Sequence, residues 1–221
     1  MAVGHGLAAL LPPGVVVVEA YDDSEPAPLF PAEEALVARA VAGRRAEFAT
    51  GRRCARDALR RLGLPAAPIL SGPRREPVWP EGVVGSITHC AGYRAAVVAL
   101  ARDVAALGID AEPDEPLPAG VLDVVARPAE RDRLEELARG RPDGNWDRVL
   151  FSAKESVFKA WYPLTGAPLE FDEGDVVLSC DDGTFAVAPL PRTPVPGAPR
   201  TLAGRWGAVG GLVRTAVVLP A

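Results

Sequence analysis

The chain has 221 residues, of which 48% are hydrophobic and 24% are charged. These values are ordinary for a globular protein, and the length allows one large domain or two small ones. The net charge of −5 gives no overall basic field, which argues against a general nucleic-acid-binding protein. A local basic patch remains compatible with this composition.

An apolar run lies near the N-terminus, over residues 7–11 and 15–18. It is interrupted by Pro12-Pro13-Gly14 and has no basic leader, so it predicts a buried strand over about 14–20 rather than a signal peptide or a membrane span. The three cysteines form no CxxC pair, and their number is odd. We therefore expect reduced thiols in a cytoplasmic protein.

Helical and strand patterns then alternate along the first half of the chain. Pro31 opens a short helical stretch, and a second helix is predicted from about Arg44 to Leu62, ending before Gly63. Residues 65–82 are rich in Pro and Gly and predict a loop with one short strand. The runs that follow indicate strands, over 83–88, 95–100 and 104–112.

The second half carries a similar mixture of elements. Its patterns predict helices over about 119–126, 128–139 and 146–162 and strands over about 174–180, 184–188, 202–209 and 212–218. Residues 189–199 predict a Pro-rich surface loop. The fold class is therefore α+β, with an N-terminal half over 1–104 and a C-terminal half over 105–221.

Two carboxylates fall on one face of the predicted strand that ends near residue 112. Side chains alternate along a strand, so Gly108, Asp110 and Glu112 share a face that is opposite to that of Leu107 and Ile109. Neighbouring carboxylates repel, and oxygen ligands without His or Cys favour a hard cation such as Mg²⁺, with Mn²⁺ as an alternative. The non-functional interpretation is a pair of solvated carboxylates on an exposed strand.

The segment Phe151-Ser-Ala-Lys-Glu-Ser-Val-Phe-Lys159 contains the only two lysines among 24 basic residues. A structural interpretation explains Ser152 and Glu155 as a helix capping box and Glu155–Lys159 as an i,i+4 ion pair. A functional interpretation makes Glu155 a third metal ligand or a base, with Lys154 and Lys159 binding phosphate.

Basic residues also crowd the helix predicted from residue 44, among them Arg44, Arg45 and Arg52. They form either a solvated face or a surface that recognises phosphate. His89, one of two histidines, ends a predicted strand. A lone histidine is more often structural than functional, and its neighbours in the sequence do not make it a metal ligand.

In combination these segments resemble the phosphopantetheinyl transferases of the larger, single-chain type associated with siderophore and polyketide synthesis. Three motifs occur in that family's order, and the likeness spans about residues 40–165. They are Gly85-Ser-Ile-Thr-His89, Gly108-Ile-Asp-Ala-Glu112 and Phe151-Ser-Ala-Lys-Glu-Ser-Val-Phe-Lys159.

The resemblance implies two similar halves related by a pseudo-twofold axis, with coenzyme A between them. It implies that Mg²⁺ is held against the pyrophosphate by Asp110, Glu112 and Glu155, and that the phosphates are neutralised by Lys154 and Lys159. It places the 3′-phosphoadenosine end against a larger set: Arg44, Arg52, His89, Thr88 and one or both of Arg74 and Arg75. Ala111 stands where some relatives have an acidic residue, so we expect water to complete the metal shell.

The implied reaction transfers the 4′-phosphopantetheine arm of coenzyme A to a serine of an apo acyl or peptidyl carrier domain. Glu155 is the candidate base for the serine proton, and Lys154 is a candidate to stabilise the departing adenosine 3′,5′-bisphosphate. A phosphohydrolase or nuclease using the same carboxylates and a non-catalytic carrier- or coenzyme A-binding protein are the alternatives. Two fused halves favour a monomer, with no nucleic acid or membrane as partner.

Overall fold

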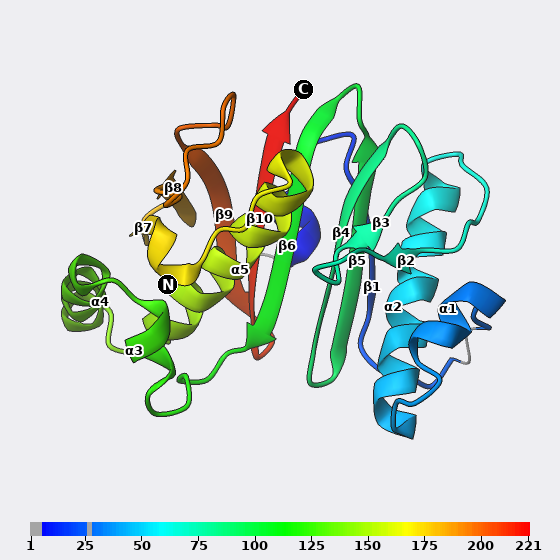
Figure 1. The fold of residues 1–221 in the computed structure, drawn as a ribbon. Coiled ribbons are helices and arrows are strands. Elements are labelled where there is room, and N and C mark those ends of the chain that lie inside the picture. The colour runs from blue at the N-terminus through cyan, green and yellow to red at the C-terminus, as the bar shows by residue number, and fades with distance from the viewer. Residues whose placement is uncertain (1–5, 26–27) are drawn as a thin grey trace.

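The computed structural model describes residues 6–25 and 28–221. Its elements form two lobes that lie side by side (Figure 1), with α1, α2 and β1–β5 in one and α3–α5 and β6–β10 in the other. Helices and antiparallel strands are mixed in both lobes, which confirms the predicted α+β class. No helix in these described ranges is long and apolar enough to cross a membrane.

The first lobe packs one long helix on a three-stranded antiparallel sheet of order β1-β5-β4. On α2 the buried Cys54, Ala58 and Leu59 pack against Val18 and Val98 of this sheet. The elements of this lobe are β1 (Val16–Ala20), α1 (Pro31–Leu36), α2 (Ala42–Arg61), β2 (Leu70–Ser71), β3 (Pro77–Val78), β4 (Val83–Cys90) and β5 (Tyr93–Leu100). The preceding turn η1 (Leu7–Leu10) lies against β9 and β10 of the other lobe.

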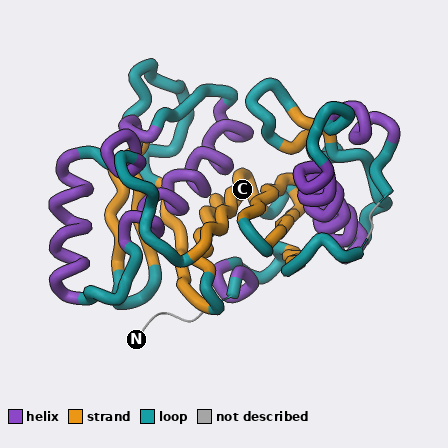
Figure 2. Tube along the Cα trace, turned by 90° about the horizontal axis from the view of Figure 1, so that it is seen from below, coloured by secondary structure: helices purple, strands orange, loops and turns teal. Residues whose placement is uncertain are grey.

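The second lobe packs α5 on a five-stranded antiparallel sheet of order β6-β10-β9-β8-β7. Val157 and Trp161 of α5 lie in the same core cluster as Val213 and Val217 of β10. Its elements are β6 (Val104–Pro113), α3 (Val121–Val125), α4 (Pro128–Gly140), α5 (Trp146–Thr165), η2 (Phe171–Glu173), β7 (Gly174–Ser179), β8 (Thr184–Pro189), β9 (Leu202–Val209) and β10 (Leu212–Pro220). Seen from below, α2 and α5 lie apart from each other, on the outer sides of the strands (Figure 2).

The two sheets meet where β4 runs beside β6. Two hydroxyls cross this seam: Ser86 Oγ accepts a hydrogen bond from the Ile109 amide, and Thr88 Oγ1 accepts one from the Ala111 amide, each at 3.1 Å. A shared core cluster that includes Val97 and Ile109 lies on the side of the sheets away from the long helices. The seam therefore fixes the strand that carries Asp110 against the other half.

Gly108 sets the close approach of α5 to β6. A Cβ atom at this position would overlap the carbonyl oxygen of Ser156 and the backbone nitrogen of Ala160. The predicted alternation is confirmed, because Ile109 packs in the shared core while Asp110 lies on the opposite face, beside Lys159 of α5. A glycine is thus required for the helix to lie directly over the carboxylates.

Three local predictions differ from the structure. Strand β1 begins at Val16 rather than near residue 14, and residues 7–10, for which no element was predicted, form a 3₁₀ turn. Strands β4 and β5 extend inward to Cys90 and Tyr93, so only two residues turn the hairpin. The capping box at Ser152 is wrong: α5 begins at Trp146, and the Ser152 hydroxyl pairs with Thr215 Oγ1 at 3.0 Å.

Replacing the seam hydroxyl in the variant Ser86→Ala should leave the buried Ile109 amide without its acceptor. An unpaired buried donor costs about 1–3 kcal/mol, so we expect the free energy of unfolding to fall by that amount. Urea denaturation measures the loss, and Thr201→Ala, at an exposed position, serves as the control. Equal unfolding midpoints for Ser86→Ala and the parent would contradict the role given to this bond.

Candidate active site

A cavity of about 660 Å³ opens between the two halves. Its walls come from α2, the segment joining β2 and β3, strand β4 and the C-terminal part of α5. Most of the residues that the sequence singled out meet here, although they come from distant segments: Arg44, Arg52, Arg74, Arg75, Thr88, His89, Glu155 and Lys159.

One end of this cavity is basic and is held together by Glu47. Arg44 donates to His89 Nε2 at 2.9 Å and to Glu47 at 3.1 Å, and the buried Arg94 donates to Glu47 at 3.4 Å. Because a guanidinium can only donate, His89 must accept at Nε2 and carry its proton on Nδ1. Burial and the charge of Arg44 lower the pKa of His89, which also favours the neutral ring.

The remaining predicted arginines differ in their surroundings. Arg52 is buried, donates to the Ile69 carbonyl oxygen at 2.7 Å, and stacks 4.1 Å from the centroid of Phe48. Burial lowers its pKa to about 10, so it keeps its charge at neutral pH. Arg74 and Arg75 lie in the loop joining β2 and β3, where Arg75 adopts a positive φ of 68°. This loop carries two cations to the cavity wall.

Asp110 lies at the acidic end, behind Thr88 and Lys159. Its Oδ1 accepts from Lys159 Nζ at 2.7 Å and from Thr88 Oγ1 at 3.2 Å. Its Oδ2 is buried and has no hydrogen-bond partner. The hydroxyl of Thr88 is engaged with Asp110 and with the seam, so its contribution to the cavity is a wall position rather than a free donor.

Three carboxylates surround the ammonium of Lys159. Burial would lower its pKa, but Asp110, Glu155 and Glu112 together raise it. Burial and the charge of Asp110 raise the pKa of Glu112 to about 7, against the opposing effect of Arg148. Burial also raises the pKa of Glu155, opposed by Lys159 and reinforced by Asp110. The cluster concentrates negative charge, and Lys159 is its internal counter-ion.

In the parts of the chain that the structure describes, no three His, Cys, Asp or Glu side chains are grouped so that they could hold a metal ion. Cations separate the acids: Lys159 bonds to Asp110, and Arg148 bonds to Glu112 at 2.9 Å. The donor set nevertheless fits a hard divalent cation, because it is all oxygen and the buried Asp110 Oδ2 lacks a partner. Oδ2 is the oxygen of Asp110 that is left for a cation while Lys159 holds Oδ1.

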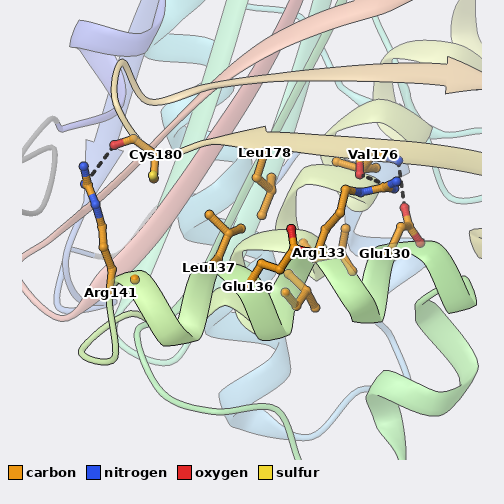
Figure 3. A pocket seen from close by; sticks show the side chains of 11 residues that line it. Glu130, Arg133, Glu136, Leu137, Arg141, Val176, Leu178 and Cys180 are labelled. Carbon is orange, nitrogen blue, oxygen red and sulfur yellow. Dashed lines mark hydrogen bonds between the residues drawn. The ribbon is translucent and has the colours of Figure 1, made fainter.

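Lys154 has surroundings different from those predicted. Its ammonium donates to Glu130 Oε2 at 2.7 Å and to the carbonyl oxygens of Phe171 and Gly174 at 2.7 and 3.1 Å. All three of its protons are engaged, and Glu130 also accepts from the Val176 amide at 2.7 Å. Figure 3 shows Glu130 beside Val176 at the end of α4. Lys154 therefore ties α5 to α4 and β7.

The sequence did not single out several side chains that hold the site in place. Ser86 bridges the seam, Glu47 organises the basic end, Glu130 neutralises Lys154, and Arg148 holds Glu112. The sequence did contain one indication that Arg148 belongs to the site. Arg148 lies seven residues before Glu155, so both fall on the same face of α5.

A cavity that is lined by several arginines and by Glu155 and Lys159 has the charges that suit a large phosphorylated ligand. Family models match both halves: the 4′-phosphopantetheinyl transferase N-terminal domain over residues 32–99, and the 4′-phosphopantetheinyl transferase superfamily over 106–196. The chain therefore belongs to the 4′-phosphopantetheinyl transferases, as the resemblance predicted, and is a transferase.

Whole-length relatives agree with this assignment. The chain is 56% identical over 220 residues to 4′-phosphopantetheinyl transferase Svp of Streptomyces mobaraensis, covering 97% of this chain and 89% of the relative. It is 45% identical over 230 residues to 4′-phosphopantetheinyl transferase PptT of Mycobacterium tuberculosis, covering 99% and 100%. It is also 33% identical over 176 residues to enterobactin synthase component D of Salmonella typhi, covering 79% and 71%.

The variant Lys154→Met should destabilise the fold, because it leaves the carboxylate of Glu130 buried without a counter-charge. Breaking one side of a buried ion pair costs about 3–5 kcal/mol, a loss that thermal and urea unfolding measure. The double variant Lys154→Met/Glu130→Gln should recover part of it, since it removes the unpaired charge and the single amide oxygen still accepts from one of the two backbone amides that Glu130 binds. If the Lys154→Met protein is as stable as the parent, the structural role of Lys154 is contradicted, and Lys154 is again a candidate phosphate ligand.

Proposed function

We propose that this transferase moves the 4′-phosphopantetheine arm of coenzyme A to a serine of an apo carrier domain and releases adenosine 3′,5′-bisphosphate. The observation that carries the proposal is the cavity between the halves, which is lined by Arg44, Arg52 and the Arg74–Arg75 loop and also by Glu155 and Lys159, with Asp110 behind Lys159. A phosphorylated nucleotide joined through a pyrophosphate to a reacting centre matches these charges.

The two parts of coenzyme A are assigned to two connected cavities. The nucleotide lies in the larger one, where Arg44 and His89 face the 3′-phosphate, with Arg52 and the Arg74–Arg75 loop beside them. A second cavity of about 180 Å³ shares Arg74, Glu155 and Phe158 with the first, and its lining is largely apolar. This narrow space suits the uncharged pantetheine arm. The shared residues then mark the position of the pyrophosphate.

A divalent cation, Mg²⁺ or Mn²⁺, would be held by Asp110, Glu112 and Glu155, and when bound it stabilises negative charge on the pyrophosphate and on the departing bisphosphate. Ala111 is buried in the shared core on the opposite face of β6, so water that completed the metal shell would lie beside the carboxylates and not beside Ala111. Lys159, displaced from Asp110, faces the phosphates as a point charge. The chain thus supplies cations for the leaving group and oxygen ligands for the metal from a single cluster.

Glu155 is the candidate general base. Its side chain is half-buried and lines both cavities, between the proposed position of the pyrophosphate and the apolar one. Burial and Asp110 raise its pKa, which brings the carboxylate closer to the basicity needed to accept a hydroxyl proton at neutral pH. The proton leaves the carrier serine for Glu155 as the serine oxygen attacks phosphorus, and the bond to the bisphosphate breaks.

We further propose that the halves, 1–104 and 105–221, are pseudo-twofold repeats and that the protein is a cytoplasmic monomer. The two family models divide the chain near the same point, and each half packs one 20-residue helix on an antiparallel sheet. The three cysteines are free, as in a reducing compartment. The carrier substrates are those of fatty-acid, polyketide or peptide synthesis, and one relative is named as a component of enterobactin synthase.

Incubation with coenzyme A and Mg²⁺ should add one phosphopantetheine arm to the serine of an apo-carrier, as measured by mass spectrometry. The variant Glu155→Gln should reduce the rate by about 10²–10⁴-fold, because the amide cannot accept the proton. Glu136→Gln, at an exposed position of α4, is the matched control.

Apo-carriers from several pathways that stay unmodified after prolonged incubation with the parent protein would contradict the proposed function. Release of nucleotide from coenzyme A without a carrier would favour the phosphohydrolase instead. Near-parental turnover in Glu155→Gln would remove only the assignment of Glu155.

The variant Arg44→Met should weaken coenzyme A binding about tenfold or more, because it removes one charge-assisted bond to the 3′-phosphate. It should leave the affinity for 3′-dephospho-coenzyme A close to that of the parent. Calorimetric titration with both ligands measures the difference, and Arg102→Met, an exposed arginine at 78% side-chain exposure, is the control. An equal loss of affinity for coenzyme A and for 3′-dephospho-coenzyme A would show that Arg44 does not bind the 3′-phosphate.

A further inference from the structure

Four polar residues of α5 form a single stripe at positions 148, 152, 155 and 159, spaced four, three and four residues apart. Such spacing places them on one face of the helix. Ser152 contacts Thr215 of β10 and Lys159 contacts Asp110 of β6, so this stripe faces the edge of the sheet that carries the carboxylates. The first member, Arg148, has no place in the reaction described above.

The guanidinium of Arg148 is buried and uses all three nitrogens on one short segment. Nη1 donates to Glu112 Oε2, Nε to the carbonyl oxygen of Glu115, and Nη2 to that of Pro116, each at 2.9 Å. The residue is only 7% exposed. The planar guanidinium of Arg148 therefore connects the carboxylate of Glu112 to the backbone of the segment that follows β6.

This arrangement constrains Glu112 more than an ordinary ion pair does. A guanidinium with two of its nitrogens fixed on backbone carbonyls cannot follow a moving carboxylate, because its donors lie in one rigid plane. It holds Oε2 and leaves Oε1 as the oxygen available to another ligand. A lysine at this position would offer one charge on a flexible stem and could not make the same three bonds.

We propose that Arg148 is the positioning residue for Glu112: it orients that carboxylate so that Oε1 faces the site, and metal affinity depends on it. The inference rests on the proposed function in one respect, the assignment of Glu112 as a metal ligand. Arg148 itself touches neither metal nor substrate. Its effect passes through Glu112, as outer-shell partners act on metal ligands.

Mn²⁺ binding in the presence of coenzyme A tests this proposal without any measurement of turnover. Electron paramagnetic resonance of free Mn²⁺ gives the bound fraction for the parent, Arg148→Lys, Glu112→Gln and the double variant. We expect Arg148→Lys to weaken Mn²⁺ binding at least tenfold. The double variant should bind no more weakly than Glu112→Gln alone, because both changes remove the same ligand.

The matched control is Arg133→Lys. Arg133 of α4 also donates to one carboxylate, that of Asp175, and to one backbone carbonyl, that of Val176, away from the cluster. It should leave Mn²⁺ binding unchanged. Calorimetry with coenzyme A and a chelator should give equal affinities for the parent and Arg148→Lys, which shows that the nucleotide site is intact. If Arg148→Lys does not fold, Arg148→Gln replaces it and is judged by the same comparisons.

The outcomes separate the inference from the function on which it rests. Parental Mn²⁺ affinity in Arg148→Lys overturns the positioning role and leaves the proposed metal site standing. Additive losses in the double variant also overturn it, because Arg148 would then act independently of Glu112. Absence of Mn²⁺ binding by the parent protein with coenzyme A overturns the metal site itself, and the inference with it.

Discussion

The seam between β4 and β6 is the constraint on which the rest of the structure depends. It joins two sheets through side-chain hydroxyls, since Ser86 and Thr88 accept from the backbone amides of Ile109 and Ala111. The same Thr88 hydroxyl donates to Asp110 at 3.2 Å. One line of bonds therefore sets both the spacing of the halves and the position of the Asp110 carboxylate. Because the cavity wall includes β4 from one half and α5 from the other, any shift at this seam changes the shape of the site.

The close approach of α5 to β6 brings charged side chains of the helix beside the carboxylates of the strand. Gly108 allows the helix backbone to lie directly on the strand, so Lys159 reaches the carboxylate of Asp110, whose charge also acts on Glu155. Burial makes unpaired charge costly, and the chain responds with a counter-ion for each buried acid: Lys159 for Asp110 and Arg148 for Glu112. These pairs partly compensate the charges of carboxylates that lie close together.

The sequence predicted the fold class and nearly every element. Hydrophobic periodicity and the Pro and Gly residues that end helices and strands are local signals, which a single sequence contains. It also predicted that Asp110 shares a strand face with Gly108, since alternation is a property of any strand. The partners of Lys154 could not be predicted, because Glu130 and the carbonyl oxygen of Gly174 meet it only after α4 and β7 pack. The capping interpretation of Ser152 failed because the helix starts six residues earlier, at Trp146, where its hydrophobic pattern also predicts the start, so Ser152 lies inside the helix.

The two lysines show why residue type alone does not assign a role. Both ammonium groups are paired with acids, but Lys154 is 4% exposed with three fixed acceptors, whereas Lys159 is 26% exposed and has one acceptor, Asp110. An ammonium with three fixed partners is held by the packing of three elements and cannot leave without unpairing them. One with a single partner at a cavity wall can exchange it. Under the proposed function the phosphates of coenzyme A supply the new partner for Lys159, and a divalent cation replaces it at Asp110. Each exchange removes the electrostatic cost of the other, so metal and coenzyme A should assist each other's binding through this one side chain.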